Sequence, residues 1–188
     1  MRIGVDIDGV LRDFTDSLKR WFVTDYPQHA NLVCPITDWD FHIFYPIGKA
    51  IYPYAFDTRA KEIFEGADPY PGAYSAMVAL KERGHKIVYV TTQPRGKEVH
   101  TLNWLLKHSF PYDGLVITGI KDIANCDVYI DDGPHNIKAL REAGKLAVCF
   151  NQPWNRFVTG DRVKTLQEFV EIVDGLSTQR STRTGTQG

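Results

Sequence analysis

The sequence predicts an α/β protein built on a doubly wound parallel β-sheet, with a small helical cap inserted after the first strand. Short apolar runs rich in β-branched residues alternate with helical patterns of about 10–12 residues, which is typical of right-handed βαβ units. Some sixty residues separate the first apolar run from the second, far more than an ordinary crossover needs. Together these two observations predict a layered sheet with one large insertion.

The individual elements follow from where each pattern begins and ends. The first strand, residues 2–7, is apolar and stops in a turn at Gly9. The other predicted strands are residues 86–90, 114–117, 127–130 and 145–150. The predicted helices are residues 73–83, 97–108, 136–143 and 164–176. Gly84 and Gly144 directly follow two of these helices, as expected for left-handed C-terminal caps.

Residues 11–70 break the alternation and hold 13 of the 23 aromatic residues. An insertion this rich in large side chains can bury a small core of its own. We therefore expect a core domain formed by residues 1–10 and 71–176, and a helical cap formed by residues 11–70. Residues 177–188 contain no large apolar side chain and are expected to form a flexible tail.

Composition narrows the class of function. The 22 basic and 23 acidic residues give a net charge of -1, so no stable nucleic-acid partner held by bulk electrostatics is expected. There is no run of 18 apolar residues and no signal-peptide pattern, so no membrane association is expected. Cys34, Cys126 and Cys149 are widely spaced and suit reduced thiols. We expect a cytoplasmic protein with a small-molecule substrate, and a homodimer remains open.

Polar residues at the ends of the apolar runs carry the functional signal. These residues are Asp6, Asp8, Thr91, Thr92, Asp131 and Asp132. Because the carboxyl ends of parallel strands meet at one edge of a sheet, we expect all six in a single crevice. Several unpaired carboxylates would repel one another there, and hard oxygen ligands suit Mg²⁺. The sequence therefore predicts Mg²⁺ as the cofactor and leaves room beside it for a phosphate ester.

The spacing of Asp6 and Asp8 suits phosphoryl transfer. Residues two apart on an extended chain project to the same side. One carboxylate can attack phosphorus, while the other protonates the leaving oxygen and later activates water. Lys121 can reach the same edge and neutralise developing charge, and Thr91 can hydrogen-bond a phosphoryl oxygen.

Each feature also has an ordinary structural explanation when it is taken alone. Asp8 with the following glycine can form a turn, and Lys121 can be a solvated surface lysine. Their order at successive strand ends is what favours catalysis over these explanations.

The aromatic residues of the insertion are the most ambiguous group. Most are expected to pack in a core, whereas Phe14, Trp39 and Phe41 lie near turns or motifs and are candidates to stack on a base. Arg95 follows the second strand and can reach a second phosphate or a sugar, although an exposed helix start explains it almost as well.

In chain order, Asp6–Phe14 (DIDGVLRDF), the apolar run into Thr91, Lys121 and Tyr129–Asp132 (YIDD) resemble the four motifs of the haloacid dehalogenase-like (HAD) phosphatases. The resemblance covers roughly residues 2–147. Within that superfamily the chain looks most like the 5'(3')-deoxyribonucleotidases. The features that carry this resemblance are DxDGVLxDF, the segment ADPYPGA leading into a helix, TTQP where the family has a Thr-Ser pair, and the interval from Lys121 to Asp131. It implies a Rossmann-like, HAD-like fold and a Mg²⁺-dependent phosphomonoesterase that hydrolyses nucleoside monophosphates.

The resemblance also implies roles for single residues. Asp6 would be the nucleophile and Asp8 the general acid and base. Mg²⁺ would be held by Asp6, the backbone carbonyl of Asp8 and the acidic pair Asp131 and Asp132. Adjacent residues on an extended chain point opposite ways, so only one of the pair is expected to be a direct ligand. The nucleotidase pattern favours Asp132 and leaves Asp131 to steady the lysine or a metal-bound water. Phe14 matches a family residue that packs near the nucleoside.

Two other interpretations stay open. The first keeps the chemistry but takes a sugar phosphate or a nucleic-acid end phosphate as the substrate, a choice that the cap decides. The second is a phospho-accepting receiver domain, which also combines aspartates, a threonine and a lysine on a doubly wound sheet. In receiver domains, however, the acidic pair comes early and no sixty-residue insertion follows the first strand.

Overall fold

A six-stranded parallel sheet with the strand order β3-β2-β1-β4-β5-β6 forms the centre of the computed structural model, which describes residues 1–184. The strands are β1 (Arg2–Val5), β2 (Lys86–Thr91), β3 (Gly114–Ile117), β4 (Val128–Asp131), β5 (Leu146–Phe150) and β6 (Arg162–Val163). The α-helices are α1 (Phe14–Asp25), α2 (Ile51–Pro53), α3 (Ala60–Gly66), α4 (Ala73–Glu82), α5 (Glu98–Lys107), α6 (Pro134–Glu142) and α7 (Leu166–Thr184). The predicted α/β class with a doubly wound parallel sheet is confirmed.

Helices cover both faces of the sheet. Alternate residues of each buried strand point to opposite sides, so both faces are apolar and both must be covered. Ile87 and Tyr89 of β2 pack with α4, α5 and α7, whereas Val88 and Val90 pack with α6 on the other face. The strand order reverses between β1 and β4, and open α/β sheets bind their ligands at such a point. The fold thus places the ends of β1 and β4 side by side.

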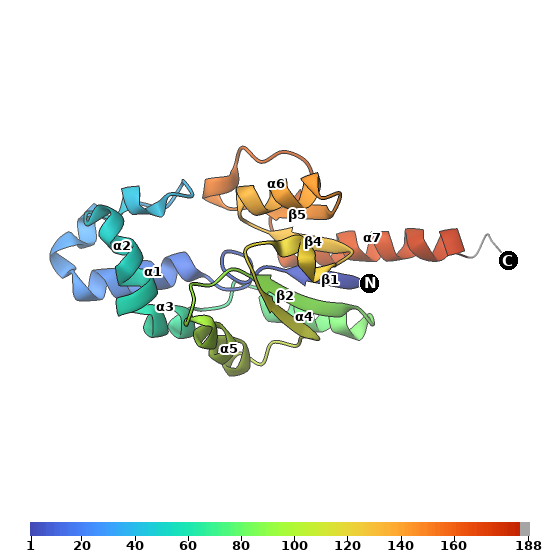
Figure 1. Ribbon diagram of the computed structural model, residues 1–188, viewed down its shortest axis with the longest axis horizontal. Coiled ribbons are helices and arrows are strands. Elements are labelled where there is room, and N and C mark those ends of the chain that lie inside the picture. The colour runs from blue at the N-terminus through green and yellow to red at the C-terminus, as the bar shows by residue number, and fades with distance from the viewer. Residues whose placement is uncertain (185–188) are drawn as a thin grey trace.

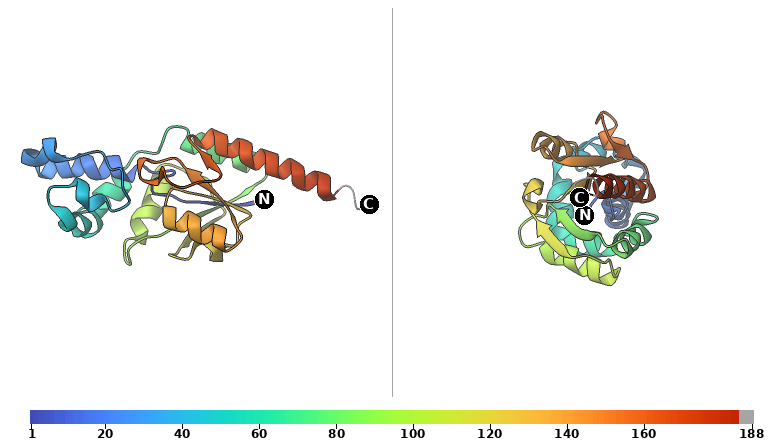
Figure 2. Two further views of the ribbon diagram at one scale, coloured as in Figure 1. Left: turned by 90° about the horizontal axis from the view of Figure 1, so that it is seen from above. Right: turned by 90° about the vertical axis from the view of Figure 1, so that its right-hand side faces the viewer.

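The helical insertion after β1 carries α1, α2 and α3 and lies at one end of the elongated molecule, whereas α7 leads to the opposite end (Figures 1 and 2). It buries an aromatic and aliphatic cluster of its own, which includes Leu18, Phe22, Tyr45, Tyr54 and Ile63. The chain leaves and re-enters the sheet domain side by side. The amide of Asp13 donates to the carbonyl of Asp68, and the amide of Tyr70 donates to the carbonyl of Leu11.

The first strand ends at Val5 rather than at residue 7, and two larger features also differ from the sequence-based expectation. The two-residue strand β6 was not predicted, because Arg162 and Val163 are too few to make an apolar run. The last helix was predicted to end at residue 176, but α7 continues to Thr184, so residues 177–184 of the expected flexible tail are helical. No proline or glycine interrupts that stretch, and Arg180 bonds Asp127 beside β4. Residues 185–188 of the expected tail lie outside the described residues.

None of the helices within residues 1–184 is both long and apolar enough to cross a lipid bilayer.

Candidate active site

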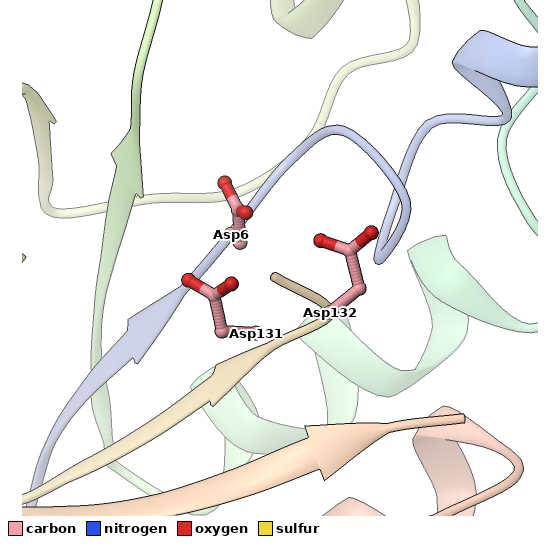
Figure 3. Close-up of side chains that lie close together, drawn as sticks. All are labelled: Asp6, Asp131 and Asp132. Atoms are coloured by element: carbon pink, nitrogen blue, oxygen red, sulfur yellow. The ribbon is translucent and has the colours of Figure 1, made fainter. Parts of the chain in front are cut away.

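Three carboxylates meet at the carboxyl ends of β1 and β4. Asp6 follows β1 directly, Asp131 is the last residue of β4, and Asp132 comes next. Each offers an oxygen atom within 4.8 Å of the oxygens offered by the other two, and all three residues are buried (Figure 3). Because the strand ends at Asp131, the alternation of an extended chain stops there. Asp131 and Asp132 therefore both face Asp6.

Lys121 joins this group from the short 3-10 helix Lys121–Ala124, which precedes β4. Its Nζ lies 2.7 Å from Asp6 Oδ2 and 2.5 Å from Asp131 Oδ2, and the residue is 5% exposed. The ordinary alternative, a solvated surface lysine, is therefore wrong for this residue. A buried ammonium group between two carboxylates fixes the positions of both.

The two neighbouring aspartates have different hydrogen-bond partners. Asp131 Oδ2 accepts from Lys121, and its Oδ1 accepts from the Gly133 amide at 2.8 Å and from Asn136 Nδ2 at 3.1 Å. Asp132 Oδ2 accepts from Trp154 Nε1 at 2.9 Å. Its other oxygen, Oδ1, has no hydrogen-bond partner within residues 1–184. Asp132, which lines the cavity described below, thus keeps one oxygen available for a further ligand, whereas Asp131 has both oxygens engaged.

The backbone approaches the cluster closely at Gly9. This residue has a φ of +77°, and a Cβ built there would lie 2.1 Å from Asp132 Oδ2. Only glycine accommodates both the left-handed conformation and the neighbouring carboxylate. The carbonyl of Gly9 accepts from Gln152 Nε2 at 2.7 Å, which ties the turn to the loop after β5.

The electrostatics of the cluster show an excess of negative charge. Burial raises the pKa of Asp6 to about 7, against the opposing effect of Lys121. Burial also raises the pKa of Asp132 well above its usual range, and Asp6 and Asp131 raise it further. Burial alone would lower the pKa of Lys121, but Asp131 and Asp6 raise it above its ordinary value. The ammonium therefore stays charged, and three carboxylates share a single buried positive charge.

The donor set of this site fits a hard divalent cation. The group consists of carboxylate oxygens only, which Mg²⁺ prefers over nitrogen or sulfur. Three carboxylates beside one ammonium leave an uncompensated negative charge that a divalent ion would balance. The free oxygen of Asp132, a residue that lines the cavity, is available as a further carboxylate ligand for such an ion.

Asp8 is not part of this carboxylate group. Its Oδ1 accepts from Arg12 Nε at 2.7 Å, and its Oδ2 accepts from Arg12 Nη2 and from Gln93 Nε2, both at 2.9 Å. The Asp8 side chain is 27% exposed and lines the same cavity as Asp6. Gly9 does form a turn, but a turn alone does not explain Asp8, whose side chain has three hydrogen bonds and borders the cavity.

A cavity of about 540 Å³ opens beside the carboxylates, between the sheet and the insertion. The sheet side contributes acidic, hydroxyl and amide groups, and the insertion contributes mostly apolar rings. The insertion residues that line it are Phe14, Thr15, Ile36, Asp38, Trp39, Asp40, Phe41, Tyr52, Phe56 and Phe64. The cavity thus has a charged floor and an aromatic wall, as a phosphate ester with a flat apolar group would require.

The three aromatic candidates all line this cavity. Phe14 stacks on Phe56 with ring centroids 5.8 Å apart and meets Phe41 edge-on at 6.3 Å. Trp39 reaches across to the sheet side, where its ring meets His135 edge-on at 4.7 Å. Trp39 lines the cavity and is 46% exposed, so much of its surface remains free.

The remaining candidates behave differently from one another. Thr91 is buried at the end of β2 and lines the cavity. Thr92 also lines it, but its hydroxyl donates to the carbonyl of Thr118 at 2.9 Å. Arg95 is exposed in the turn before α5 and is not among the lining residues, so the structure gives its expected substrate contact no support. An exposed turn at the start of a helix explains this arginine.

Sequence reasoning missed several residues of the site. Trp154 and Asn155 follow β5, and Asn155 Nδ2 donates to the carbonyl of Asp132 at 2.9 Å. The run NQPWN directly after an apolar strand was a usable signal, because it ends at the same edge of the sheet as the aspartates. Arg12 and Gln93 gave no such signal, since their role depends on side-chain direction.

Known proteins resemble this chain in sequence over nearly its whole length. The family described as "5' nucleotidase, deoxy (Pyrimidine), cytosolic type C protein" matches residues 1–180. A protein of Chlorobaculum tepidum named "Putative 5'(3')-deoxyribonucleotidase" is 26% identical over 191 residues, which cover 94% of this chain and 91% of that protein. The human "5'(3')-deoxyribonucleotidase, cytosolic type" is 27% identical over 143 residues, or 70% of each chain.

Solved structures resemble the chain in fold. The L-2-haloacid dehalogenase of Xanthobacter autotrophicus superposes with a TM-score of 0.64 at 11% sequence identity, covering 93% of this chain and 98% of that one. At this identity the likeness concerns the fold alone, which is HAD-like as the sequence motifs implied.

Proposed function

Because this chain belongs to the nucleotidase family of cytosolic type C, we propose that it is a Mg²⁺-dependent phosphomonoesterase that hydrolyses nucleoside monophosphates, with deoxyribonucleotides as its preferred substrates. The observation that carries the proposal is the buried group of Asp6, Asp131, Asp132 and Lys121, because all of these except Asp131 line an aromatic-walled cavity. With the family known, the interpretation as a receiver domain falls away.

Asp6 is the nucleophile in this proposal. One of its carboxylate oxygens forms a bond to phosphorus as the bond between phosphorus and the ester oxygen breaks, and Asp8 gives a proton to the leaving oxygen. Water then attacks the phosphorus of the aspartyl-phosphate, gives a proton to Asp8, and phosphate leaves as the Asp6 carboxylate is restored. Both Asp6 and Asp8 line the cavity, which supports this assignment.

Lys121 and Thr91 bind the phosphoryl oxygens. The ammonium of Lys121 carries three protons and bonds two carboxylates, so one proton is left for the substrate. Thr91 places a hydroxyl at the same edge of the sheet. Preorganised donors of this kind stabilise charge that develops on the transferring group.

Asp6, Asp132 and the backbone carbonyl of Asp8 are the proposed ligands of Mg²⁺. The free Oδ1 of Asp132 supports the choice of Asp132 over Asp131, whose two oxygens hold Lys121, the Gly133 amide and Asn136. When bound, the ion would offset carboxylate charge and withdraw charge from the phosphoryl group. Asp131 then acts by holding Lys121 in place.

The aromatic wall binds the nucleoside in this proposal. Phe14, Trp39 and Phe41 all line the cavity, and Trp39 is partly exposed. Flat bases stack on such rings regardless of sequence-specific hydrogen bonds. A sugar phosphate would leave this apolar surface without a matching group, which favours a nucleotide over that alternative substrate.

The proposal places the enzyme in the cytoplasm. Cys34, Cys126 and Cys149 are all free thiols, as is usual in a reducing compartment. The printed name of the human relative, which is of cytosolic type, supports the same location.

Phosphate release from a panel of esters tests the function. The panel holds ribo- and deoxyribonucleoside 5'- and 3'-monophosphates together with sugar phosphates, each with Mg²⁺ and with chelator. We expect deoxyribonucleotides to be hydrolysed fastest, and chelator to abolish turnover. A sugar phosphate preferred over every nucleotide would reject the substrate class, and full activity in chelator would reject the metal.

A further inference from the structure

Arg12 is an uncommon residue to find at the base of an insertion, because its charged side chain is completely buried. The guanidinium lies between two aromatic rings, 4.7 Å from the centroid of Phe64 and 5.2 Å from that of Trp104. Its Nη2 donates to Thr101 Oγ1 at 3.1 Å, and its Nη1 donates to the carbonyl of Phe64 at 3.4 Å. Contacts from α3 and α5 therefore hold the guanidinium plane in one orientation.

A further pair of hydrogen bonds joins the guanidinium of Arg12 to the carboxylate of Asp8. Nε and Nη2 of Arg12 donate to the two oxygens of the Asp8 carboxylate at 2.7 and 2.9 Å, a parallel two-bond pairing. Asp8 cannot leave this pairing at low cost, because the guanidinium has no access to water and would lose its carboxylate partner. We therefore expect the carboxylate to remain on Arg12 throughout the reaction.

The pairing distinguishes the two oxygens of Asp8. Oδ2 accepts from Arg12 Nη2 and from Gln93 Nε2, which uses both of its lone pairs. Oδ1 accepts only from Arg12 Nε among residues 1–184, so one lone pair remains. The Asp8 side chain is partly exposed and borders the cavity, whereas Arg12 is enclosed behind it.

We infer that Arg12 is a positioning residue, whose buried guanidinium fixes the plane of the Asp8 carboxylate so that Oδ1 is the atom that exchanges a proton with the leaving oxygen. This inference rests on the proposed phosphomonoesterase reaction. Arg12 does not itself line the cavity and acts through Asp8. Since α3 belongs to the insertion and α5 to the sheet domain, the same residue ties the placement of the insertion to the orientation of Asp8.

A comparison of leaving groups tests the inference. Arg12→Met removes the charge and both bonds to Asp8, and Arg12→Lys keeps the charge but not the two-bond geometry. For a deoxyribonucleotide, whose alkoxide leaving group needs a proton, we expect kcat/KM to fall about 10–100-fold in Arg12→Met and less in Arg12→Lys. For p-nitrophenyl phosphate, whose leaving group needs none, we expect a fall of less than about threefold. Equal losses on both esters would overturn the inference.

A double variant shows whether Arg12 acts through Asp8. In the Asp8→Asn background, Arg12→Met is expected to change kcat/KM by less than about twofold, because the group that it positions is already disabled. A further loss of tenfold or more there would overturn the inference. This cycle uses whichever ester the wild type hydrolyses best. If that ester is not a nucleotide, the proposed substrate fails while the inference is still tested, and a wild type that hydrolyses no ester overturns both.

Arg59→Met is the matched control. Arg59 makes the same two-bond pairing, to Asp25 at 2.7 and 2.8 Å, and lies 5.2 Å from the Trp21 ring, but it is confined to the insertion. We expect this variant to leave both ester activities within about twofold. Thermal unfolding of every variant separates loss of fold from loss of positioning. Failure of both Arg12 variants to fold would assign Arg12 to stability alone and overturn the inference.

Discussion

At the scale of single residues, Asp6 is a buried carboxylate whose ionised form destabilises the folded protein but suits catalysis. Its Oδ1 accepts from the Ile7 amide at 2.8 Å and its Oδ2 contacts Lys121, so its geometry is fixed. Burial nevertheless raises its pKa to about 7, which means that its ionised form is disfavoured in the folded protein. A bond to phosphorus or to a cation would relieve this disfavoured charge, so the carboxylate is well suited to react with either.

Replacing this carboxylate should therefore remove activity without harming the fold. We expect Asp6→Asn to lower turnover of every substrate by at least ~10³-fold, because a non-nucleophilic amide replaces the attacking carboxylate. In the absence of metal at pH 8, the variant should melt at the same temperature as the wild type or higher, since a disfavoured charge has been removed. Phosphate release and thermal unfolding measure the two effects.

The control for this variant is Asp16→Asn, an exposed aspartate on α1 that pairs with Arg20. It should keep activity within about twofold. Retained phosphatase activity in Asp6→Asn would refute the assignment of the nucleophile.

What the sequence could predict about single residues depends on whether backbone position or side-chain direction decides their role. Asp6, Asp131 and Lys121 were predicted to share one edge of the sheet, and the structure brings them together, because strand ends place them there. Arg12 could not be predicted in the same way. Its partners Phe64 and Thr101 are 52 and 89 residues away, and no local pattern encodes such contacts.

At the scale of elements, the pairing of β1 with β4 depends on a glycine in the middle of β1. Gly4 pairs with Tyr129, and a Cβ on Gly4 would lie 2.5 Å from Tyr129 Cδ1. The tyrosine ring is itself fixed, because its hydroxyl accepts from the Cys126 amide at 2.9 Å. Glycine within a strand often marks such a close approach.

Adding one methyl group here should therefore weaken the sheet behind the active site. We expect Gly4→Ala to destabilise the protein by ~1–3 kcal/mol, or about 2–12 °C in Tm, with kcat unchanged well below the melting temperature. Gly114→Ala in β3 is the matched control, because its Cβ would meet Val88 at an ordinary 3.7 Å. If thermal unfolding showed the same decrease in Tm for both variants, the role given to Gly4 would be contradicted.

Element boundaries were predictable where the apolar pattern was long and punctuated. The strand at residues 114–117 agrees with β3, and α4 ends one residue before the predicted end, next to Gly84. The insertion was less accessible, because its short helical turns, such as Ile51–Pro53, are stabilised by tertiary packing of aromatic residues rather than by a periodic pattern.

At the scale of the whole molecule, the site is assembled from segments that are far apart in the chain, and its charge couples it to global stability. Asp6 and Asp132 both have raised pKa values, so the metal-free folded state holds protons that the unfolded chain would release. The unfolded state binds fewer protons between about pH 4 and pH 7. The free energy of unfolding of the metal-free protein therefore falls as the pH rises through that window.

A bound divalent cation should reverse this loss, and more strongly at high pH. Mg²⁺ needs ionised carboxylates, so protons compete with it at pH 6 and much less at pH 8. At a hundredfold excess over its Kd, ligand binding adds ~2.7 kcal/mol to the free energy of unfolding, or about 5–11 °C in Tm. We expect a gain of this size at pH 8 and a smaller one at pH 6 for the same Mg²⁺ concentration, measured by thermal unfolding against chelator. Asp132→Asn should lose most of the gain, because a neutral amide replaces the carboxylate whose Oδ1 has no hydrogen-bond partner within residues 1–184. An equal gain at both pH values, or an undiminished gain in that variant, would place the cation somewhere other than among these aspartates.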